Sequence, residues 1–468
     1  MKRVLCLLLL TCLPAAIFAA PNYPFPQNAE YPYGIVPTSV DADKVQEAFD
    51  EFMELYEEQG ALARIKHDNL ENSVSEGIAY GMLLLVYMDN DKNQTQAKFD
   101  KLWAYYNNFL DSKGLMNWKI NGFSQVAADG RNSATDAELD AAVGLMQAYK
   151  QWGDEKYLND AKALIAKIAK EEVNENGYLK PGDSWDTEKN ISYFSTAALT
   201  LFKQVSDFDW DKVIANSYSL IKKAQNASTG LVPNWCDEQG NPSSSPYDNS
   251  RGNYTYDATR TPWRLAWAYS WYGHLEAKET CEKIASWISS KTANDPEMVV
   301  DGYKLDGTET SEYNNSTFVG PFGCAGMVDE NHQEWLDKCY NHLCDIKEDR
   351  YYQISIKILT LLYLSGNMPD FWSTTDVKPE GSARFIKNQK PFRFNLSANQ
   401  KLHFSTPVAG NVAVSVFNIN GQILSASVNR FFGEGNHILP LPYMATGTYI
   451  LKIRLPGNEF SKQVSIVR

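Results

Sequence analysis

The chain has 468 residues and carries 57 acidic against 44 basic side chains, a formal net charge of -13. Phosphate binding requires a basic face, so this charge argues against nucleic acid as the main partner. A mean hydropathy of -0.40 and a single long apolar run exclude a polytopic membrane protein. The length accommodates a large domain and a smaller one, and 12 Trp, 26 Tyr and 21 Phe offer much aromatic surface.

The apolar run lies at the N-terminus. Lys2 and Arg3 precede an apolar stretch at 4–13, and small residues follow it. This layout predicts a cleaved secretory signal peptide over 1–20, too short to span a bilayer stably. The alternatives are an uncleaved anchor and, less favoured, a lipoprotein attached through Cys12. We therefore expect a secreted or cell-surface protein with no stable membrane span and a mature net charge of -15, because the two basic residues are lost.

Cysteine usage says little about function. The mature chain would keep Cys236, Cys281, Cys324, Cys339 and Cys344. An odd number leaves at least one free thiol, and the pairing of any others cannot be deduced from the sequence. The chain contains no CxxC motif and no Cys/His cluster, so we expect no metal and no other cofactor.

Helical periodicity governs most of the chain. From about residue 43 to 364, apolar positions recur every three or four residues. The pattern predicts twelve helices, at 43–59, 75–90, 95–109, 136–152, 155–173, 191–206, 210–225, 261–273, 277–290, 316–327, 331–346 and 351–365. Long loops separate some of them, at 111–133, 174–190, 226–260 and 291–315, and such loops are usually functional. We expect an all-α domain over 21–372, in which six helical hairpins close into an (α/α)6 barrel.

The pattern changes after Trp372. Residues 373–390 are polar and charged and are predicted to be a linker. From Pro391 onward, short runs alternate between apolar and polar residues, at 412–417, 422–428, 448–453 and 462–467. Asn420-Gly421 is a hairpin turn signal. Residues 391–468 are therefore predicted to form a small β-sandwich.

Three stretches place acids at the starts of predicted helices. These acids are Glu76 in 74–82, Asp136, Glu138 and Asp140 in 134–140, and Asp257 in 253–264. Taken singly, each could complement a helix dipole or cap backbone amides. Together they suit glycosidic hydrolysis, which needs one carboxylic acid to protonate the leaving oxygen and one carboxylate to activate water or attack carbon.

Aromatic residues flank these acids. Loops near them carry Trp118, Trp185, Tyr193, Trp235 and Trp263. Such rings can stack on pyranose faces, and the alternative for each is ordinary core packing. The acids and the rings together point to a sugar-binding cleft.

Over most of residues 30–368, the sequence resembles glycoside hydrolase family 8, inverting enzymes on an (α/α)6 barrel that cut β-1,4-linked glucans, xylans or chitosan. Residues 75–77 (Ser-Glu-Gly) and 80–82 (Tyr-Gly-Met) match the segment of the general acid. Residues 256–264 match the segment of the general base. Lesser matches are Asn117-Trp118, 192–194 and 230–235, and the departures are Glu138 in place of the usual Asp, with Ala141, Gly144 and Ala268 in place of other common residues.

The resemblance implies a role for each acid. Glu76 would be the general acid and must hold a proton at working pH. Asp257 would be the general base on water, with Arg260 holding its charge, and Asp136 would bind and distort the sugar. Inversion requires the acid and the base to lie about 6.5–9.5 Å apart. The candidate substrate-binding side chains are Trp118, Trp185, Tyr193, Tyr256, Arg260 and Trp235.

The expected activity is endo-acting hydrolysis of β-1,4-glucan, because the stretches around Glu76 and after Asp136 look more like the family's cellulases than its oligoxylanases. The alternatives within the family are a xylanase, a mixed-linkage glucanase and a chitosanase. A non-catalytic glycan-binding surface protein is the alternative from another class, and the intact acids argue against it.

Residues 391–468 resemble the C-terminal sorting domain of type IX secretion, with a valine-rich strand, residues 447–449 (Gly-Thr-Tyr) and a terminal Arg468. The alternative is a carbohydrate-binding module, which needs a row of exposed aromatic rings, and no Trp follows Pro391. We therefore expect the secretion machinery to be a partner of the tail and polysaccharide to be the partner of the main domain.

Overall fold

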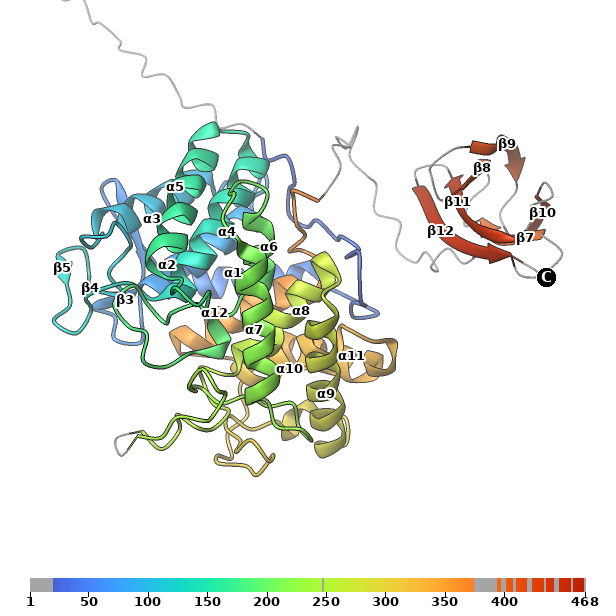
Figure 1. Cartoon of the computed structure of the whole chain (residues 1–468). Coiled ribbons are helices and arrows are strands. Elements are labelled where there is room, and N and C mark those ends of the chain that lie inside the picture. Colours follow the sequence, from blue (N-terminus) through green and yellow to red (C-terminus); the bar gives the residue numbers. More distant parts are fainter. Residues whose placement is uncertain are drawn as a thin grey trace, which may run out of the picture. The chain divides into compact units, whose positions relative to one another are not determined.

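The computed structural model divides into two compact units, Met1–Lys378 and Pro379–Arg468, each described here by itself (Figure 1). The described residues are 20–245, 248–373, 394–396, 401–406, 410–418, 423–432, 435–441, 446–455 and 458–466. Four predicted features lie wholly or mostly outside them, namely the signal peptide, the linker, the Asn420-Gly421 turn and the terminal Arg468.

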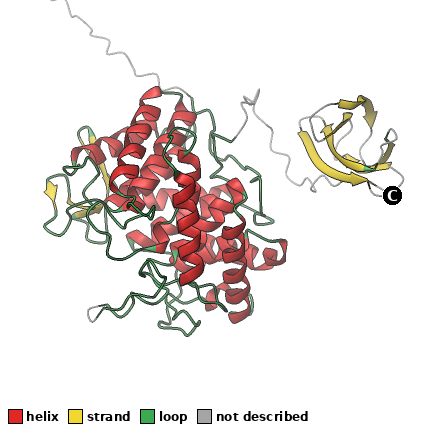
Figure 2. Ribbon diagram, in the orientation of Figure 1, coloured by secondary structure: helices red, strands yellow, loops and turns green. Residues whose placement is uncertain are grey.

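The first unit is mostly helical, as the periodicity predicts (Figure 2). Its described residues form twelve α-helices: α1 (Ala42–Met53), α2 (Ser75–Tyr87), α3 (Gln96–Asn108), α4 (Thr135–Trp152), α5 (Glu155–Glu171), α6 (Thr196–Phe202), α7 (Trp210–Ala224), α8 (Arg260–Tyr272), α9 (Leu275–Lys291), α10 (Ser316–Gly326), α11 (Gln333–Asp345) and α12 (Tyr351–Leu364).

The even-numbered helices contact one another in a closed cycle. α2 contacts α4, α4 contacts α6, and the series continues through α8, α10 and α12 back to α2. Each odd-numbered helix contacts an even-numbered one, α3 against α2 and α5 against α4, for example. Helices that are apolar all round must be buried, which explains why nearly every residue of α2 and α12 is buried whereas α5 buries one face only.

Two predicted helices differ from the structure. The first ends at Met53 rather than at 59, because Tyr56–Gln59 (β1) pairs with Leu62–Ile65 (β2) in a hairpin. Gly60, in the turn of this hairpin, has a φ of 62°, which favours glycine and is incompatible with a continued helix, and Arg64 of β2 forms an ion pair with Glu57 of β1. The helix expected at 191–206 begins as a separate 3-10 turn, Ile191–Tyr193, before α6.

A small antiparallel sheet lies directly before the first acid of interest. It consists of β3 (Asn72–Val74), β4 (Lys119–Asn121) and β5 (Gln125–Val126), in the order β3-β4-β5. The backbone N–H of Ser75 donates to the carbonyl of Trp118 at 2.9 Å, which extends the pairing by one residue. The sheet therefore fixes the start of α2, where Glu76 lies.

The second unit consists of two antiparallel sheets in its described residues. Their orders are β10-β7-β6 and β12-β11-β8-β9. The strands are β6 (Phe394–Leu396), β7 (Lys401–Thr406), β8 (Gly410–Asn418), β9 (Ile423–Phe432), β10 (Gly435–Pro440), β11 (Gly447–Leu455) and β12 (Asn458–Ile466). Both sheets contribute to one apolar cluster, in which Val412, Val414 and Val416 of β8 lie on one face at the period of a strand.

The five cysteines that follow residue 20 are all described and all free, four of them buried and Cys344 half-buried. Nowhere in the described residues is there a helix both long enough and apolar enough to cross a bilayer. Across the same residues, no group of three His, Cys, Asp or Glu side chains is arranged to hold a metal ion.

Candidate active site

A cavity of about 760 Å³ opens where α2, α8 and α12 begin and two long loops meet. It is lined by Glu76, Asn234, Asn249, Ser250, Asn253, Thr255, Tyr256, Asp257, Arg260, Asp301, Thr310, Ser311, Tyr313 and Tyr352. Glu76, Asp257, Arg260 and Tyr256 are among the residues that the sequence singles out. The cavity therefore gathers helix N-termini and polar loop side chains around two of the three candidate acids.

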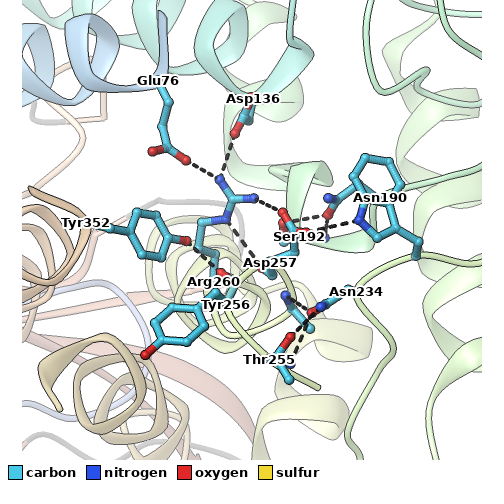
Figure 3. Close-up of polar contacts among 12 residues, drawn as sticks. Glu76, Asp136, Asn190, Ser192, Asn234, Thr255, Tyr256, Asp257, Arg260 and Tyr352 are labelled. Carbon is cyan, nitrogen blue, oxygen red and sulfur yellow. Dashed lines mark hydrogen bonds and ion pairs between the residues drawn. The ribbon is translucent and has the colours of Figure 1, made fainter. Parts of the chain in front are cut away.

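Arg260 joins all three acids (Figure 3). Its Nη1 donates to Glu76 Oε2 at 2.6 Å and to Asp136 Oδ2 at 2.7 Å, and its Nη2 donates to Asp257 Oδ1 at 3.1 Å. The residue is only 2% exposed, so these contacts are made away from bulk water. Hydrogen bonds between ionised groups are short and strong, and a guanidinium fork fixes the direction of each carboxylate.

Glu76 is the second residue of α2 and has both carboxylate oxygens occupied. The hydroxyl of Tyr351, at the start of α12, donates to Glu76 Oε1 at 2.8 Å, and Arg260 occupies Oε2. Gly77 makes the approach of Tyr351 possible, because a Cβ at that position would lie 3.0 Å from the tyrosine hydroxyl. The side chain of Glu76 retains 18% exposure toward the cavity.

Asp136, in the first turn of α4, lies deeper than Glu76. Its Oδ1 accepts from the backbone N–H of Ala137 at 3.0 Å, and its side chain is only 4% exposed. Burial raises its pKa to about 7, Arg260 opposes this shift, and the negative charges of Glu76 and Asp140 add to it. Asp136 therefore takes up a proton more readily than an exposed aspartate does.

Asp257 ends the long loop before α8 and is the most exposed acid of the three, at 34%. Its Oδ2 accepts from the indole Nε1 of Trp235 at 3.0 Å. Asn234 holds the turn in place, because its side-chain oxygen accepts from the backbone N–H groups of Thr255 and Ala258 at 3.1 and 2.9 Å. One carboxylate oriented in this way can face water in the cavity.

A second, separate ion pair lies one helical turn further along α8. Arg264, one helical turn after Arg260, donates through Nη1 and Nη2 to the two carboxylate oxygens of Asp140. The pair is buried and links α8 to α4. Since Arg264 is committed to Asp140, Arg260 is left as the cation that serves the three acids.

Three of the predicted aromatic residues lie together beside Arg260. Trp185 stacks on Trp235 with ring centroids 4.6 Å apart, and Tyr193 meets Trp235 edge-on at 6.3 Å. The Tyr193 ring lies 5.2 Å from the Arg260 guanidinium carbon. Trp185 is 39% exposed, so this stack presents a flat aromatic surface to solvent.

The other predicted aromatic residues have different surroundings. Tyr256 is 40% exposed in the cavity, and its hydroxyl donates to Asp301. Trp118 is half-buried near the start of α2, with Lys119 over its ring. Trp263 is fully buried and parallel to Trp267, which corrects the idea that it is available to stack on a sugar.

Several site residues carry no signal strong enough to find them from the sequence. Tyr351 contacts Glu76, and Tyr352 donates to the carbonyl oxygen of Tyr256 at 2.8 Å. Asp301 binds Tyr256 from a loop 45 residues away. A pair of tyrosines at a helix start and an isolated loop acid are common in proteins, so only the three-dimensional arrangement identifies them. Asn234, by contrast, lies in 230–235, a stretch that resembles the glycoside hydrolase family.

The arrangement is suited to acid–base chemistry. It offers a buried carboxyl with a raised pKa (Asp136), a carboxylate at the cavity surface (Glu76), a third that is more open to water (Asp257), and one cation that contacts all three. Hydroxyl and amide groups line the rest of the cavity, next to exposed aromatic rings. Polar groups and flat rings together are what a carbohydrate requires of its binding site.

Comparison with known proteins gives consistent matches. Residues 23–366 match Glycosyl hydrolases family 8. The chain is 34% identical to Endoglucanase A of Acetivibrio thermocellus over 394 residues, which span 78% of this chain and 79% of that protein. It is 32% identical to a Beta-glucanase of Niallia circulans, over 78% of this chain and 96% of the relative. The structure of a Beta-1,3-1,4-glucanase from Paenibacillus sp. X4 matches with a TM-score of 0.70 and 32% identity, covering 74% of this chain and 99% of that one.

Proposed function

The chain belongs to Glycosyl hydrolases family 8 and is an endoglucanase-like glycoside hydrolase, and we propose that it cleaves internal β-1,4-glucosidic bonds with inversion. The observation that carries the proposal is the single guanidinium of Arg260, which contacts Glu76 and Asp257 at the cavity and the more deeply buried Asp136. The closed cycle of helix contacts supports an (α/α)6 barrel as the scaffold.

Glu76 acts as the general acid in this proposal. It lies at the cavity surface with one oxygen on Tyr351 and the other on Arg260. Asp136 shares Arg260 Nη1 with it, and burial together with the charge of Glu76 raises the pKa of Asp136. As the general acid, Glu76 delivers a proton to the glycosidic oxygen as the bond breaks.

Asp257 acts as the general base. Arg260 and the indole of Trp235 each take one of its oxygens, which fixes the carboxylate plane while leaving a third of the side chain exposed. A water molecule that donates to Asp257 attacks the anomeric carbon from the face opposite the leaving group. Inversion needs room for this water between the acid and the base, and the Arg260 guanidinium contacts both carboxylates.

Asp136 binds the sugar at the cleavage point. Its position at the start of α4 and the hydrogen bond that it accepts from the backbone N–H of Ala137 fix its orientation. Its contact with a hydroxyl of the sugar ring can therefore strengthen as that ring distorts. The stacked pair of Trp185 and Trp235 forms a platform for a neighbouring sugar.

The test of these roles uses Glu76→Gln and Asp257→Asn. Each variant is expected to lose roughly 10²–10⁴-fold in kcat, the range of general acid–base catalysis, while still binding cello-oligosaccharide. Binding by calorimetry and turnover by reducing-sugar release separate the two effects. Near-normal kcat in either variant would remove that residue from the mechanism. The anomer first released, read by NMR, decides between inversion and retention.

A mixed-linkage β-1,3-1,4-glucan is the second candidate substrate. It is favoured by the likeness to the Paenibacillus Beta-1,3-1,4-glucanase, which covers 99% of that chain. Initial rates on carboxymethylcellulose, lichenan, xylan and chitosan distinguish the candidates. The highest kcat/KM on carboxymethylcellulose supports the β-1,4-glucanase, whereas the highest value on lichenan supports the mixed-linkage enzyme. No activity on any of the four would favour a non-catalytic glycan-binding protein.

We further propose that the N-terminal segment exports the chain and that the C-terminal unit serves the secretion machinery. The separation of Pro379–Arg468 as a unit of its own supports a task distinct from catalysis, since the cavity is lined by residues 76–352. A stop codon after Lys378 is expected to leave kcat unchanged and to abolish release or surface display. Normal export of the truncated chain would contradict the proposed role of the tail.

A further inference from the structure

Two fully buried glutamates lie behind Asp136, on the side of α4 that faces α3 and α5. Glu138 belongs to α4, and Glu172 is the C-cap residue that directly follows α5. Glu138 Oε1 accepts from the Tyr106 hydroxyl at 3.2 Å, and Glu172 Oε1 accepts from the Ser133 hydroxyl at 2.6 Å. Within the described residues, the Oε2 atom of each is buried and accepts no hydrogen bond of ordinary geometry, although the nearby Thr135 hydroxyl lowers the pKa of Glu172. Both side chains are therefore half-satisfied as acceptors.

No cation forms an ion pair with either glutamate in the described residues. Arg264 binds Asp140, Lys113 binds Asp183, and the Lys180 ammonium donates to the carbonyl oxygens of Glu171 and Asp183. The other charged or titratable groups that act on the two are Asp136, Asp183 and Tyr106. A buried carboxylate without a cation takes up a proton rather than bear the cost of desolvation. Burial accordingly raises the pKa of Glu138 well above its usual range and that of Glu172 to about 8.

Hydrogen bonds link Glu172 to the turn that precedes Asp136. Ser133, which donates to Glu172, also donates its backbone N–H to Asp183 Oδ1 at 3.1 Å and accepts from the backbone N–H of Asp183 at 3.1 Å. The backbone N–H of Thr135 donates to the carbonyl of Pro181 at 3.1 Å. The approach is close enough that a Cβ at Gly182 would lie 2.3 Å from the Ser133 carbonyl oxygen. The turn that sets the direction of Asp136 is thus held from the Glu172 side.

We propose that Glu138 and Glu172 are positioning residues that work in the protonated form, and that loss of their protons displaces Asp136 and limits activity at alkaline pH. The inference rests on the proposed role of Asp136 in hydrolysis. When either glutamate releases its proton to solvent, an unpaired negative charge appears next to Asp136. That charge drives a proton onto Asp136 and weakens its ion pair with Arg260, which also holds Glu76 and Asp257.

Glu138→Gln and Glu172→Gln test the proposal, because an amide mimics the protonated acid and cannot ionise. In both variants we expect kcat/KM at pH 9 relative to that at pH 6 to rise about tenfold over the wild-type ratio, with a shallower alkaline limb. Glu138→Asp keeps the acid but moves it by one methylene, and we expect kcat to fall about tenfold while KM changes little. Glu171→Gln is the matched control, since Glu171 precedes Glu172 and pairs with the exposed Lys170.

Infrared spectroscopy gives a readout independent of turnover. The wild type at neutral pH is expected to show the carbonyl stretch of buried protonated carboxyls, and each Gln variant to lose part of that band, whereas Glu171→Gln keeps it. Absence of the band, an unchanged ratio of kcat/KM in both Gln variants, or folded Gln variants inactive at every pH would each overturn the proposal. A wild type inactive on all β-glucans would instead refute the proposed function and leave the infrared result as the measure of the protonated pair.

Discussion

Arg260 is the cation that pairs with all three candidate acids of the site. It contacts three carboxylates with two nitrogens, and it is buried near the Tyr193 and Tyr352 rings, whose centroids lie 5.2 and 5.9 Å from its guanidinium carbon. Lysine has a single ammonium group and cannot reproduce this fork. Arg260→Lys is therefore expected to lower kcat by about 10²-fold or more and to destabilise the fold by about 3–5 kcal/mol, the cost of breaking a buried ion pair.

Steady-state kinetics and urea unfolding measure these two effects. Arg350→Lys is the control, because Arg350 is exposed and its described contacts are made by its backbone. A kcat for Arg260→Lys close to that of the wild type would mean that the three acids keep their orientation without a bidentate cation, contrary to the site described here.

Trp235 has two separable contacts, one through its indole nitrogen to Asp257 and one through its ring face to Trp185. Trp235→Phe keeps a ring but removes the N–H donor, so we expect kcat to fall about tenfold as Asp257 loses its orientation. Trp185→Ala removes the exposed ring, and we expect KM for cello-oligosaccharides to rise about tenfold, since a stacked ring is worth about 1–3 kcal/mol.

The two variants act as controls for each other. A rise in KM alone for Trp235→Phe would indicate a binding role rather than one in orienting the base. A fall in kcat alone for Trp185→Ala would exclude the platform proposed for a neighbouring sugar. Kinetics on a series of oligosaccharides of increasing length measure both parameters.

At the scale of elements, Lys189 forms ion pairs that link its own loop to the loop after α7. The side chain is 1% exposed and forms ion pairs with Asp186 of its own loop and with Glu238 of the loop that follows α7. The backbones of Lys189 and Cys236 also pair, with N···O distances of 2.8 and 3.0 Å. These contacts hold the segments that carry Trp185 and Trp235 next to each other.

Lys189→Met removes the cation and keeps the length of the side chain. We expect KM for glucan to rise about five- to tenfold with little change in kcat, because the loops loosen while Arg260 still holds the acids. Lys170→Met is the control, since Lys170 is 80% exposed. An unchanged KM, together with an unchanged melting temperature, would show that the backbone pairing alone fixes the loops.

The helices could be predicted from the sequence because their apolar faces repeat with a fixed period, and all twelve were expected within a few residues except at the ends of α1 and α6. The hairpin of β1 and β2 and the short strand β3 could not be predicted, since each depends on partners that local sequence does not reveal, such as Arg64 with Glu57. The same distinction applies to the site. Sequence motifs indicate Glu76, Asp136 and Asp257, whereas Tyr351 could not be predicted because only the tertiary packing brings it to Glu76.

At the scale of the whole molecule, the pH dependence of stability reflects how buried acids are distributed. Several surface carboxyls pair with lysines, as Glu58 does with Lys101, whose hydrogen bond lowers the pKa of that glutamate. Such groups stabilise the fold above their unfolded pKa and lose that contribution as the pH falls through the folded pKa. The buried pair behind Asp136 works in the opposite direction.

Burial raises the pKa of Glu172 from 4.5 to about 8. Below pH 4.5 the folded and unfolded chains both hold this proton, so the full stability is present there. Between pH 4.5 and 8 the unfolded chain releases the proton while the folded chain keeps it, so stability falls as the pH rises through this window. Glu172→Gln removes the difference, and we expect its melting temperature to exceed that of the wild type by several degrees at pH 8 but by little at pH 4. Thermal unfolding across this range, with Glu171→Gln as the control, measures the effect. If the melting temperatures of the wild type and Glu172→Gln changed in the same way with pH, Glu172 would be ionised in the folded protein at neutral pH. A cation or a rearrangement near Ser133 would then have to balance its charge.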